Sequence, residues 1–261
     1  MSRLGSYLER RGAVPSALRT IVSIAVILLA WQVLATRVVT NRLLLAPPLP
    51  VFQALADEAR KGALWTNAVA TISALGVAFP FAVLVGVFVG LALSGSRMLS
   101  LMVGPMLTAL YSVPIVALAP LFIAGLGLGF ASKFVIVSMV AVFPVIVTTE
   151  AGLRNTDANL VEAARSFNAS RWQVFTTVTF PYALPFVVSG IRVAWARALV
   201  GVVVAEFFGS FAGFGFAIMA AGQMFDTATL LAYVIVLGAL GLAGSLAFEW
   251  LEKKLAPWRH E

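Results

Sequence analysis

The sequence predicts an all-α membrane protein with about six transmembrane helices. Hydrophobic residues make up 61% of its 261 residues and charged residues only 11%, whereas a soluble domain carries roughly 25% charged residues. The mean hydropathy is +0.99. A water-soluble globule has too little polar surface with such a composition, which excludes soluble enzymes, disordered linkers and nucleic-acid-binding proteins. The pI near 10.4 therefore indicates Lys and Arg at a membrane surface rather than a nucleic-acid partner.

Cysteine and histidine usage excludes several chemistries. The chain contains no cysteine, and its single histidine is His260. Disulfides, thiolate metal sites, iron–sulfur clusters and cysteine nucleophiles are therefore excluded. A histidine metal site or a Ser-His triad is excluded by the same count, so we expect no metal or cofactor in this chain.

Runs without charged residues locate the spans, because a transmembrane helix needs roughly 20 apolar residues. Such runs cover 20–36, 62–96, 98–132, 134–149 and 227–248, and a shorter one covers 198–205. The fifth span combines this shorter run with residues 185–197, which include Arg192 and Arg197. We place six helices near 19–36, 67–94, 99–124, 131–150, 184–206 and 229–249.

The first segment has an alternative interpretation as a signal peptide, since a basic start precedes a short apolar stretch. Against this, the lead-in is long, Trp31 and Gln32 follow the apolar core, and no clean small-residue cleavage site is present. We therefore expect a retained helix after an N-terminal segment at 1–18, with one membrane domain over 19–255 and a tail at 256–261.

The distribution of Lys and Arg predicts the orientation, because cytoplasmic loops are enriched in these residues. An inside N-terminus places eleven of them in the cytoplasm and five outside, which makes both termini cytoplasmic. The inner residues are Arg3, Arg10, Arg11, Arg19, Arg97, Arg154, Arg165, Arg171, Lys253, Lys254 and Arg259; the outer ones are Arg37, Arg42, Arg60, Lys61 and Lys133.

Small residues and prolines within the spans predict close packing and breaks. Stripes of small residues let helices approach each other in membranes, and prolines break or kink a span where the freed backbone lines a cavity or is buried. The run at 125–129 predicts an outer turn. The stripes are Gly86, Gly90, Ser94 and Gly238, Gly241, Gly244; the prolines of the third span are Pro105, Pro114 and Pro120.

The segment 150–185 is the one long polar interruption, and it predicts two short helices on the inner surface. The first covers about Ala158–Phe167 with Asp157 as its N-cap, and its residues Leu160, Ala164 and Phe167 share a face. Asn168 suits the left-handed position that ends a helix. Ser170 and Gln173 form a capping box for the second helix, which we expect Pro181 and Pro185 to end. An interfacial anchor and a docking element for a soluble partner both fit this segment.

This segment resembles the EAA signature of ABC importer permeases. Glu162, Ala163 and Ala164 match it outright, whereas Asn168 stands at its Gly position and Val178 at its Ile position. Phe180-Pro181 stands at its Leu-Pro position. Further similarity to permeases of the nitrate/sulfonate/taurine importer group extends over about 40–255, at 45–50, 111–129, 156–160, 190–192, 203–206, 213–215 and 225–227.

The resemblance implies the type I ABC importer permease fold in a bacterial inner membrane. It further implies a pair of permeases, usually a homodimer, with two cytoplasmic ATPase subunits and an extracytoplasmic binding protein. ATP and Mg would be bound by the ATPase, since this chain has no G-x-x-x-x-G-K-[ST] loop. The implied coupling residues are Asp157, Leu160, Glu162, Ala163, Ala164, Arg165, Phe167, Asn168, Ala169 and Ser170.

Charges within spans are candidates for the translocation path, because burying them in lipid is costly. Arg192 lies near the cytoplasmic end and is expected to snorkel. Arg197 is expected either to line the path or to pair with Glu206. The full set of path candidates is Tyr111, Pro114, Phe122, Arg197, Glu206 and Met219, with helix packing as the alternative role for the uncharged ones.

Competing classes are an ion-coupled secondary transporter, a membrane-embedded enzyme and a scaffold. The first tends to need more ionisable residues near the midplane, and the second needs clustered acids or metal ligands. The docking segment favours the ATP-driven importer permease. An oxyanion such as a sulfonate, taurine or nitrate is the first expectation for the solute, and a vitamin-like or aromatic solute is the second.

Overall fold

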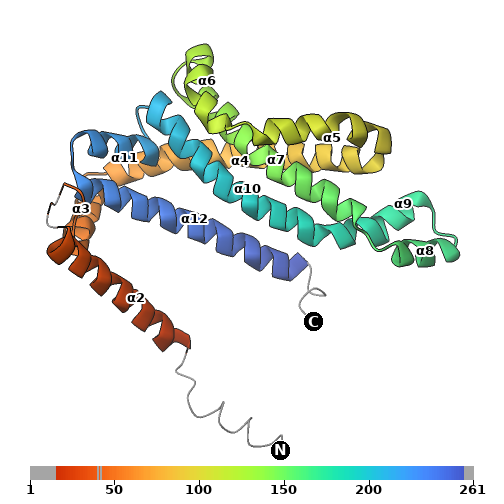
Figure 1. The fold of residues 1–261 in the computed structure, drawn as a ribbon, viewed down its shortest axis with the longest axis horizontal. Helices are drawn as coiled ribbons and strands as arrows, with labels where there is room; N and C mark the ends of the chain where they lie inside the picture. Colours follow the sequence, from red (N-terminus) through yellow and green to blue (C-terminus); the bar gives the residue numbers. More distant parts are fainter. Residues whose placement is uncertain (1–15, 40, 42, 256–261) are drawn as a thin grey trace, which may run out of the picture.

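A computed structural model describes residues 16–39, 41 and 43–255, which form an elongated bundle of helices (Figure 1). No strand occurs among these residues. The predicted tail at 256–261 and most of the N-terminal segment at 1–18 lie outside the described ranges. The elements are α2 (Ser16–Val33), η1 (Leu34–Val38), α3 (Pro48–Arg60), α4 (Ala63–Gly95), α5 (Arg97–Ser112), η2 (Ile115–Leu118), α6 (Ala119–Leu126), α7 (Phe130–Arg154), α8 (Ala158–Ser166), α9 (Arg171–Val174), η3 (Phe175–Thr179), α10 (Phe180–Gly209), α11 (Phe214–Gln223) and α12 (Thr227–Leu255).

The predicted number and order of spans are confirmed. Within the described part of the chain, five helices are long and apolar enough to cross a membrane: Thr20–Val38, Ala63–Gly95, Phe130–Arg154, Arg171–Gly209 and Thr227–Leu255. The third predicted span is a bent pair, Arg97–Ser112 and Ile115–Leu126, with an angle of 71° between its halves. Of the three prolines in that span, Pro114 stands at the break, whereas Pro105 lies inside α5.

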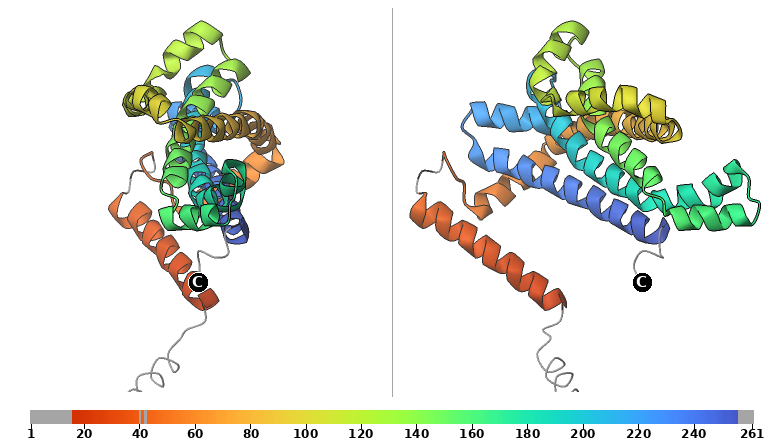
Figure 2. Two further views of the ribbon diagram at one scale, coloured as in Figure 1. Left: turned by 90° about the vertical axis from the view of Figure 1, so that its right-hand side faces the viewer. Right: turned by 45° about the vertical axis from the view of Figure 1, so that its right-hand side comes forward.

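Helix α7 lies at the centre of the bundle, between α4 and α10 (Figures 1 and 2). The contact is built from small side chains, including Ala78 of α4, Ala141 of α7 and Ala198 of α10, each fully buried. A Cβ added at Gly86 would lie 2.6 Å from the Cβ of Val145, and one at Gly90 would lie 2.7 Å from that of Thr149. The predicted close approach at the first stripe is therefore confirmed at its two glycines.

In the second glycine stripe, on α12, only some of the glycines pack closely against α10. A Cβ at Gly244 would collide with the indole of Trp195, whereas Gly238 has open space around it. Trp195 Nε1 also donates a hydrogen bond of 3.2 Å to the carbonyl of Gly241. Helix α12 is therefore held against α10 through Trp195, and Gly238 takes no part in that contact.

The predicted end of the second loop helix is wrong. The chain continues without interruption from α9 through η3 into α10, so that one helical span covers Arg171–Gly209. Pro181 lies in the first turn of α10, directly after the π-helical turn η3. A proline disrupts a regular helix through its missing N–H and its contact with the carbonyl four residues back. The wider π turn changes that geometry, so the helix continues past the proline.

Three helices at the periphery complete the fold. Helix α2 stands apart from the bundle (Figure 1), and only 6% of the apolar stretch that forms its span is buried. Neither α3 nor α11 was predicted as a helix from the sequence. Helix α11 is apolar but has only 10 residues, too few to cross a bilayer. It packs against α10 and α12 at the end of the bundle opposite α8 (Figure 1).

Candidate functional site

The segment between α7 and α10 forms a defined helical element that projects from one end of the bundle (Figure 1). Asp157 Oδ1 accepts a hydrogen bond of 2.8 Å from the N–H of Asn159, which confirms the predicted N-cap of α8. Asn168 has a φ of 57°, the left-handed conformation that Asn and Gly adopt most readily. The reversal between α8 and α9 is therefore encoded locally.

The start of α9 is also fixed by local hydrogen bonds. The N–H of Ser170 donates to Gln173 Oε1 at 2.8 Å, and the N–H of Gln173 donates to Ser170 Oγ at 3.3 Å. This is the predicted capping box. The end of α8 is closed by the backbone N–H groups of Asn168 and Ala169, which donate to the carbonyls of Arg165 and Ala164. We name residues 157–174 the projecting element.

The projecting element has an outer face that is largely exposed and an inner face against the bundle. Phe167 is 87% exposed and Trp172 is 71% exposed, and Leu160 is also exposed. Ala164 is half-buried beside them. Val161 and Arg165 lie on an adjacent side of α8, where both line grooves against the end of the bundle. The outer face is therefore apolar and free to contact another molecule.

Beneath this element, Glu150 joins two helices of the bundle. Its Oε1 accepts a hydrogen bond of 2.8 Å from Ser100 Oγ of α5, and it lies 3.2 Å from Arg154 Nε of α7. Arg154 also lines the groove under α8, together with Glu162 and Arg165. The base of the projecting element is thus connected to α5, the first half of the broken span. This connection was not predicted from the sequence.

A cavity of about 340 Å³ lies at the break between α5 and α6. It contains three of the predicted path residues, Tyr111, Pro114 and Arg197, which come from two different spans. Tyr111 and Phe143 form one wall, with ring centroids 6.0 Å apart. The remaining lining residues are Ser112, Val113, Ile115, Val116 and Val140.

The other path candidates lie elsewhere. Phe122 packs in a separate apolar cluster with Ala119 and Ala205. Met219 is a half-buried residue of α11 and is not among the residues that line this cavity. Glu206 is fully buried in α10.

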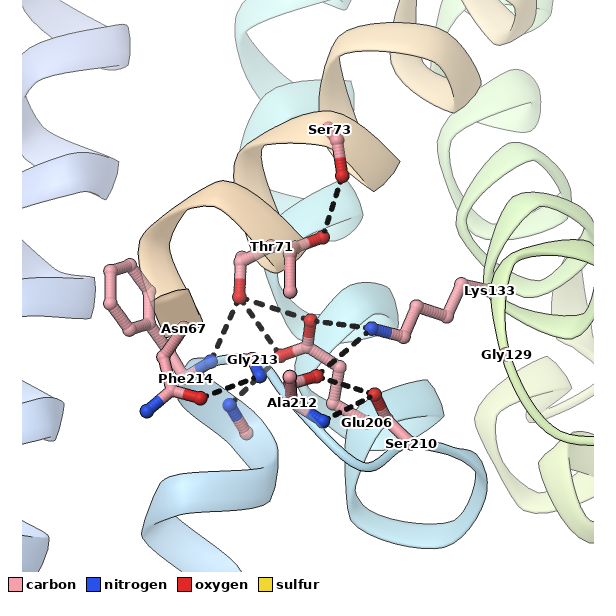
Figure 3. Close-up of polar contacts among 12 residues, drawn as sticks. Asn67, Thr71, Ser73, Gly129, Lys133, Glu206, Ser210, Ala212, Gly213 and Phe214 are labelled. Atoms are coloured by element: carbon pink, nitrogen blue, oxygen red, sulfur yellow. Dashed lines mark hydrogen bonds and ion pairs between the residues drawn. The ribbon is translucent and has the colours of Figure 1, made fainter. Parts of the chain in front are cut away.

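Glu206 is the centre of a buried polar network, which we name the Glu206 network (Figure 3). Its Oε1 lies 3.1 Å from Lys133 Nζ of α7. Thr71 Oγ1 of α4 donates to the carboxylate at 3.0 Å, and the N–H of Gly215 donates to Oε2 at 2.9 Å. Lys133 also donates to the carbonyl of Ala212 at 3.2 Å. The network therefore joins α4, α7, α10 and the start of α11.

Two expectations are corrected by this network. The partner of Glu206 within the chain is Lys133, not Arg197. Lys133 was counted among the outer cations at the edge of the fourth predicted span, but it is a buried residue of the first turn of α7. It stands at the edge of the uncharged run 134–149, so its sequence position resembles that of a loop cation. No sequence signal links it to a carboxylate 73 residues away.

A second set of hydrogen bonds extends the network toward α3 and α12. Asn67 Oδ1 accepts from the N–H of Gly213 at 2.9 Å, and its Nδ2 donates to the Tyr233 hydroxyl at 3.1 Å. The Tyr233 hydroxyl in turn donates to Glu58 Oε2 at 2.8 Å. The end of the bundle remote from the projecting element is therefore held by continuous polar contacts through six helices.

Fold and sites together define a class: a multi-pass helical membrane protein with a broken span beside a cavity and a rigid helical element projecting at one end. The chain belongs to the family of binding-protein-dependent transport system inner membrane components, whose family model matches residues 82–258. It is a permease subunit of an ABC importer, and ATP hydrolysis is carried out by a separate ATPase subunit.

Relatives and solved structures agree with this assignment. The chain is 32% identical to a putative aliphatic sulfonates transport permease of Bacillus subtilis, over 90% of this chain and 86% of that protein. It is 30% identical to the taurine transport system permease of Escherichia coli, over 92% and 89%. An inward-facing structure of the MetNI methionine ABC transporter matches with a TM-score of 0.63 and 18% identity, over 74% of this chain and 97% of that one.

Proposed function

We propose that this chain is one half of a permease pair that imports a small oxyanion, and that Glu162–Ser170 is its coupling helix. In this proposal a substrate-binding protein delivers the solute from outside, and an ATPase binds the projecting element from inside. The permease domain covers 19–255, both termini are cytoplasmic, and lipid covers the exposed apolar flanks. One observation carries the proposal: the outer face of a capped helical element exposes Phe167 and Trp172 at the end of the bundle.

The helices of the bundle provide a route by which the coupling helix can act. The span Arg171–Gly209 is one continuous helix of 39 residues, and it joins the projecting element to the Glu206 network. Packed helices move as rigid bodies between discrete arrangements. ATPase closure would therefore shift the pair of permeases between inward-open and outward-open states, because ATP binding favours one of the two.

The solute class is supported by the relatives. The two relatives described above are named for aliphatic sulfonates and taurine, both sulfonated molecules. Two further relatives favour a second candidate, a vitamin-like solute: the formylaminopyrimidine permease of Halalkalibacterium halodurans is 27% identical, and the riboflavin permease of Chloroflexus aurantiacus is 31% identical. These two matches cover 89% and 91% of this chain.

The test is ATP-driven uptake by the reconstituted complex with an altered coupling helix. Ala164→Glu places a charge on the docking face and should abolish both ATPase retention and uptake, with normal membrane insertion. Ala56→Glu is the matched control, since Ala56 is exposed on α3 at the opposite end of the bundle. Normal ATPase stimulation by Ala164→Glu would refute the assignment. Uptake that follows an ion gradient, and stops with an ionophore instead of with ATP depletion, would refute the importer mechanism.

A further inference from the structure

We propose that the cavity at the break of the third span binds the anionic group of the transported solute, with Arg197 as its ligand. The expected solute is a small organic anion with an apolar body, such as a sulfonate or a carboxylate. This inference rests on the proposed function as a permease and narrows the class of its substrate. It assigns a selective site within the membrane domain itself, beyond any selection made by a binding protein.

Arg197 differs from Lys133 and Arg192, two other cations within the spans, because it has no ion-pair partner among the described residues. Lys133 is paired with Glu206 at 3.1 Å, and Arg192 lies 3.8 Å from Glu252. Arg197 makes no hydrogen bond or ion pair with any residue in the described part of the chain, and its side chain is exposed and lines the cavity. A lone guanidinium facing lipid would be costly, so such a residue faces a water-filled cavity or a ligand.

The position of Arg197 along α10 places it inside the hydrocarbon layer. Gly209 ends the helix twelve residues later, which corresponds to about 18 Å at 1.5 Å per residue. The bilayer core is about 30 Å thick. The charge is therefore too deep to be explained by contact with the headgroups at the outer end.

The backbone at the same place is also exceptional for a membrane span. Helices α5 and α6 meet at an angle of 71°, and Pro114 and η2 occupy the break. Irregular backbone at membrane depth occurs where it is buried in protein or lines a cavity, and broken helices mark substrate sites in other transporters. The break and the unpaired Arg197 are two independent observations, and both point to the same cavity.

The lining chemistry selects for an organic anion. The nine lining residues include no Asp or Glu, so no charge compensates Arg197 and a cationic solute is repelled. A guanidinium matches two oxygens of a carboxylate or sulfonate. The hydroxyl of Tyr111 has no hydrogen-bond partner among the described residues and offers a further donor.

The other residues of the cavity wall would contact the apolar body of such an anion. Val113, Ile115, Val140 and Phe143 give the wall aliphatic and aromatic surface. The volume of the cavity, about 340 Å³, is near the lower end of the range of about 300–1,000 Å³ for small-molecule sites. A small inorganic anion such as nitrate would leave this apolar surface without contacts, so an organic anion fits better.

The test measures ligand-induced stabilisation of the full permease–ATPase complex in lipid nanodiscs. Benzenesulfonate is the probe, and the neutral benzenesulfonamide is its matched control. We expect millimolar benzenesulfonate to raise the unfolding midpoint of the wild-type complex, and benzenesulfonamide to leave it unchanged. The Arg197→Gln variant should lose about tenfold or more in affinity for the probe, the change expected when a charge-assisted contact is lost.

Control variants separate a binding role from a structural one. Arg192→Gln removes a paired arginine from the same helix, and benzenesulfonate should raise its unfolding midpoint as much as that of wild type. In Arg197→Lys the rise should be smaller but still present. An equal shift in Arg197→Gln and wild type, or no shift in wild type, would overturn the inference. A different result would refute the proposed function: an ATPase that does not copurify with the wild-type permease.

Discussion

Lys133 Nζ lies 3.1 Å from Glu206 Oε1, and these side chains are only 6% and 0% exposed. The pair joins the first turn of α7 to the last turn of α10, at the end of the bundle remote from the projecting element. Thr71 and the backbone of Gly215 complete the hydrogen bonding of the carboxylate. The two long helices that flank the projecting element are therefore also fixed to each other at their far ends.

Removing one member of this pair should destabilise the permease. Lys133→Met leaves a buried carboxylate without its counter-charge, which costs about 3–5 kcal/mol in comparable buried pairs. We expect a clear fall in the thermal unfolding midpoint of the purified permease in detergent.

The double variant distinguishes the ion pair from simple loss of side-chain packing. Lys133→Met combined with Glu206→Gln removes both charges and keeps an amide that can bond to Gly215. It should recover most of the lost stability. A double variant as unstable as the sum of the two single variants would show that the pair is not the cause.

The contact between α4 and α7 should tolerate no added side chain at Gly86. Gly86→Ala would place its Cβ 2.6 Å from Val145 Cβ, and overpacking of this kind costs about 1–3 kcal/mol. Gly76→Ala is the matched control on the same helix, because no atom lies within 4 Å of its added Cβ. Thermal unfolding of both variants measures the difference, and equal midpoints would contradict the packing described for α7.

The reversal at Asn168 should depend on its left-handed backbone. Its φ is 57°, so Asn168→Gly should keep ATP-driven uptake close to wild type. Asn168→Val should impair it, because a β-branched residue in this conformation is strained by about 1–3 kcal/mol. Uptake and ATPase retention should fall together. An Asn168→Val complex with normal uptake would show that the turn geometry does not matter for coupling.

The first span should be present in the mature protein. Its helix α2 continues into η1 without a break and ends at Val38, and Trp31 Nε1 donates a hydrogen bond of 3.1 Å to the carbonyl of Ala46. We therefore expect intact-mass analysis of the membrane-purified protein to include residues 20–38. A mass that corresponds to cleavage after this segment would support the signal-peptide alternative.

Features encoded by neighbouring residues were predictable from the sequence. The spans follow from runs without charge, and the caps at Asp157 and Ser170 follow from side chains that bond to nearby backbone. The reversal at Asn168 follows from a residue type that tolerates the left-handed conformation. The approach at Gly86 and Gly90 follows from a spacing of four residues on a helix face. Each of these features depends on residues close together in the sequence and not on contacts with distant parts of the chain.

Features that depend on distant residues were not predictable. The Lys133–Glu206 pair joins residues far apart in the chain, and Lys133 looked like a loop cation because it borders an uncharged run. The continuity of α9 and α10 depends on a π turn before Pro181, which compensates for a residue that normally ends a helix. The cavity beside Arg197 likewise requires the break at Pro114 and α10 to be adjacent in space.

Contact between the projecting element and an ATPase is the central claim, and site-specific cross-linking tests it most directly. The chain has no cysteine, so a photoreactive maleimide reagent would label only an introduced one. Phe167→Cys on the outer face of the projecting element should cross-link to the ATPase subunit in the assembled complex. Trp65→Cys, exposed at the start of α4, should give no such product. Equal yields from both positions, or no ATPase adduct from position 167, would contradict the account.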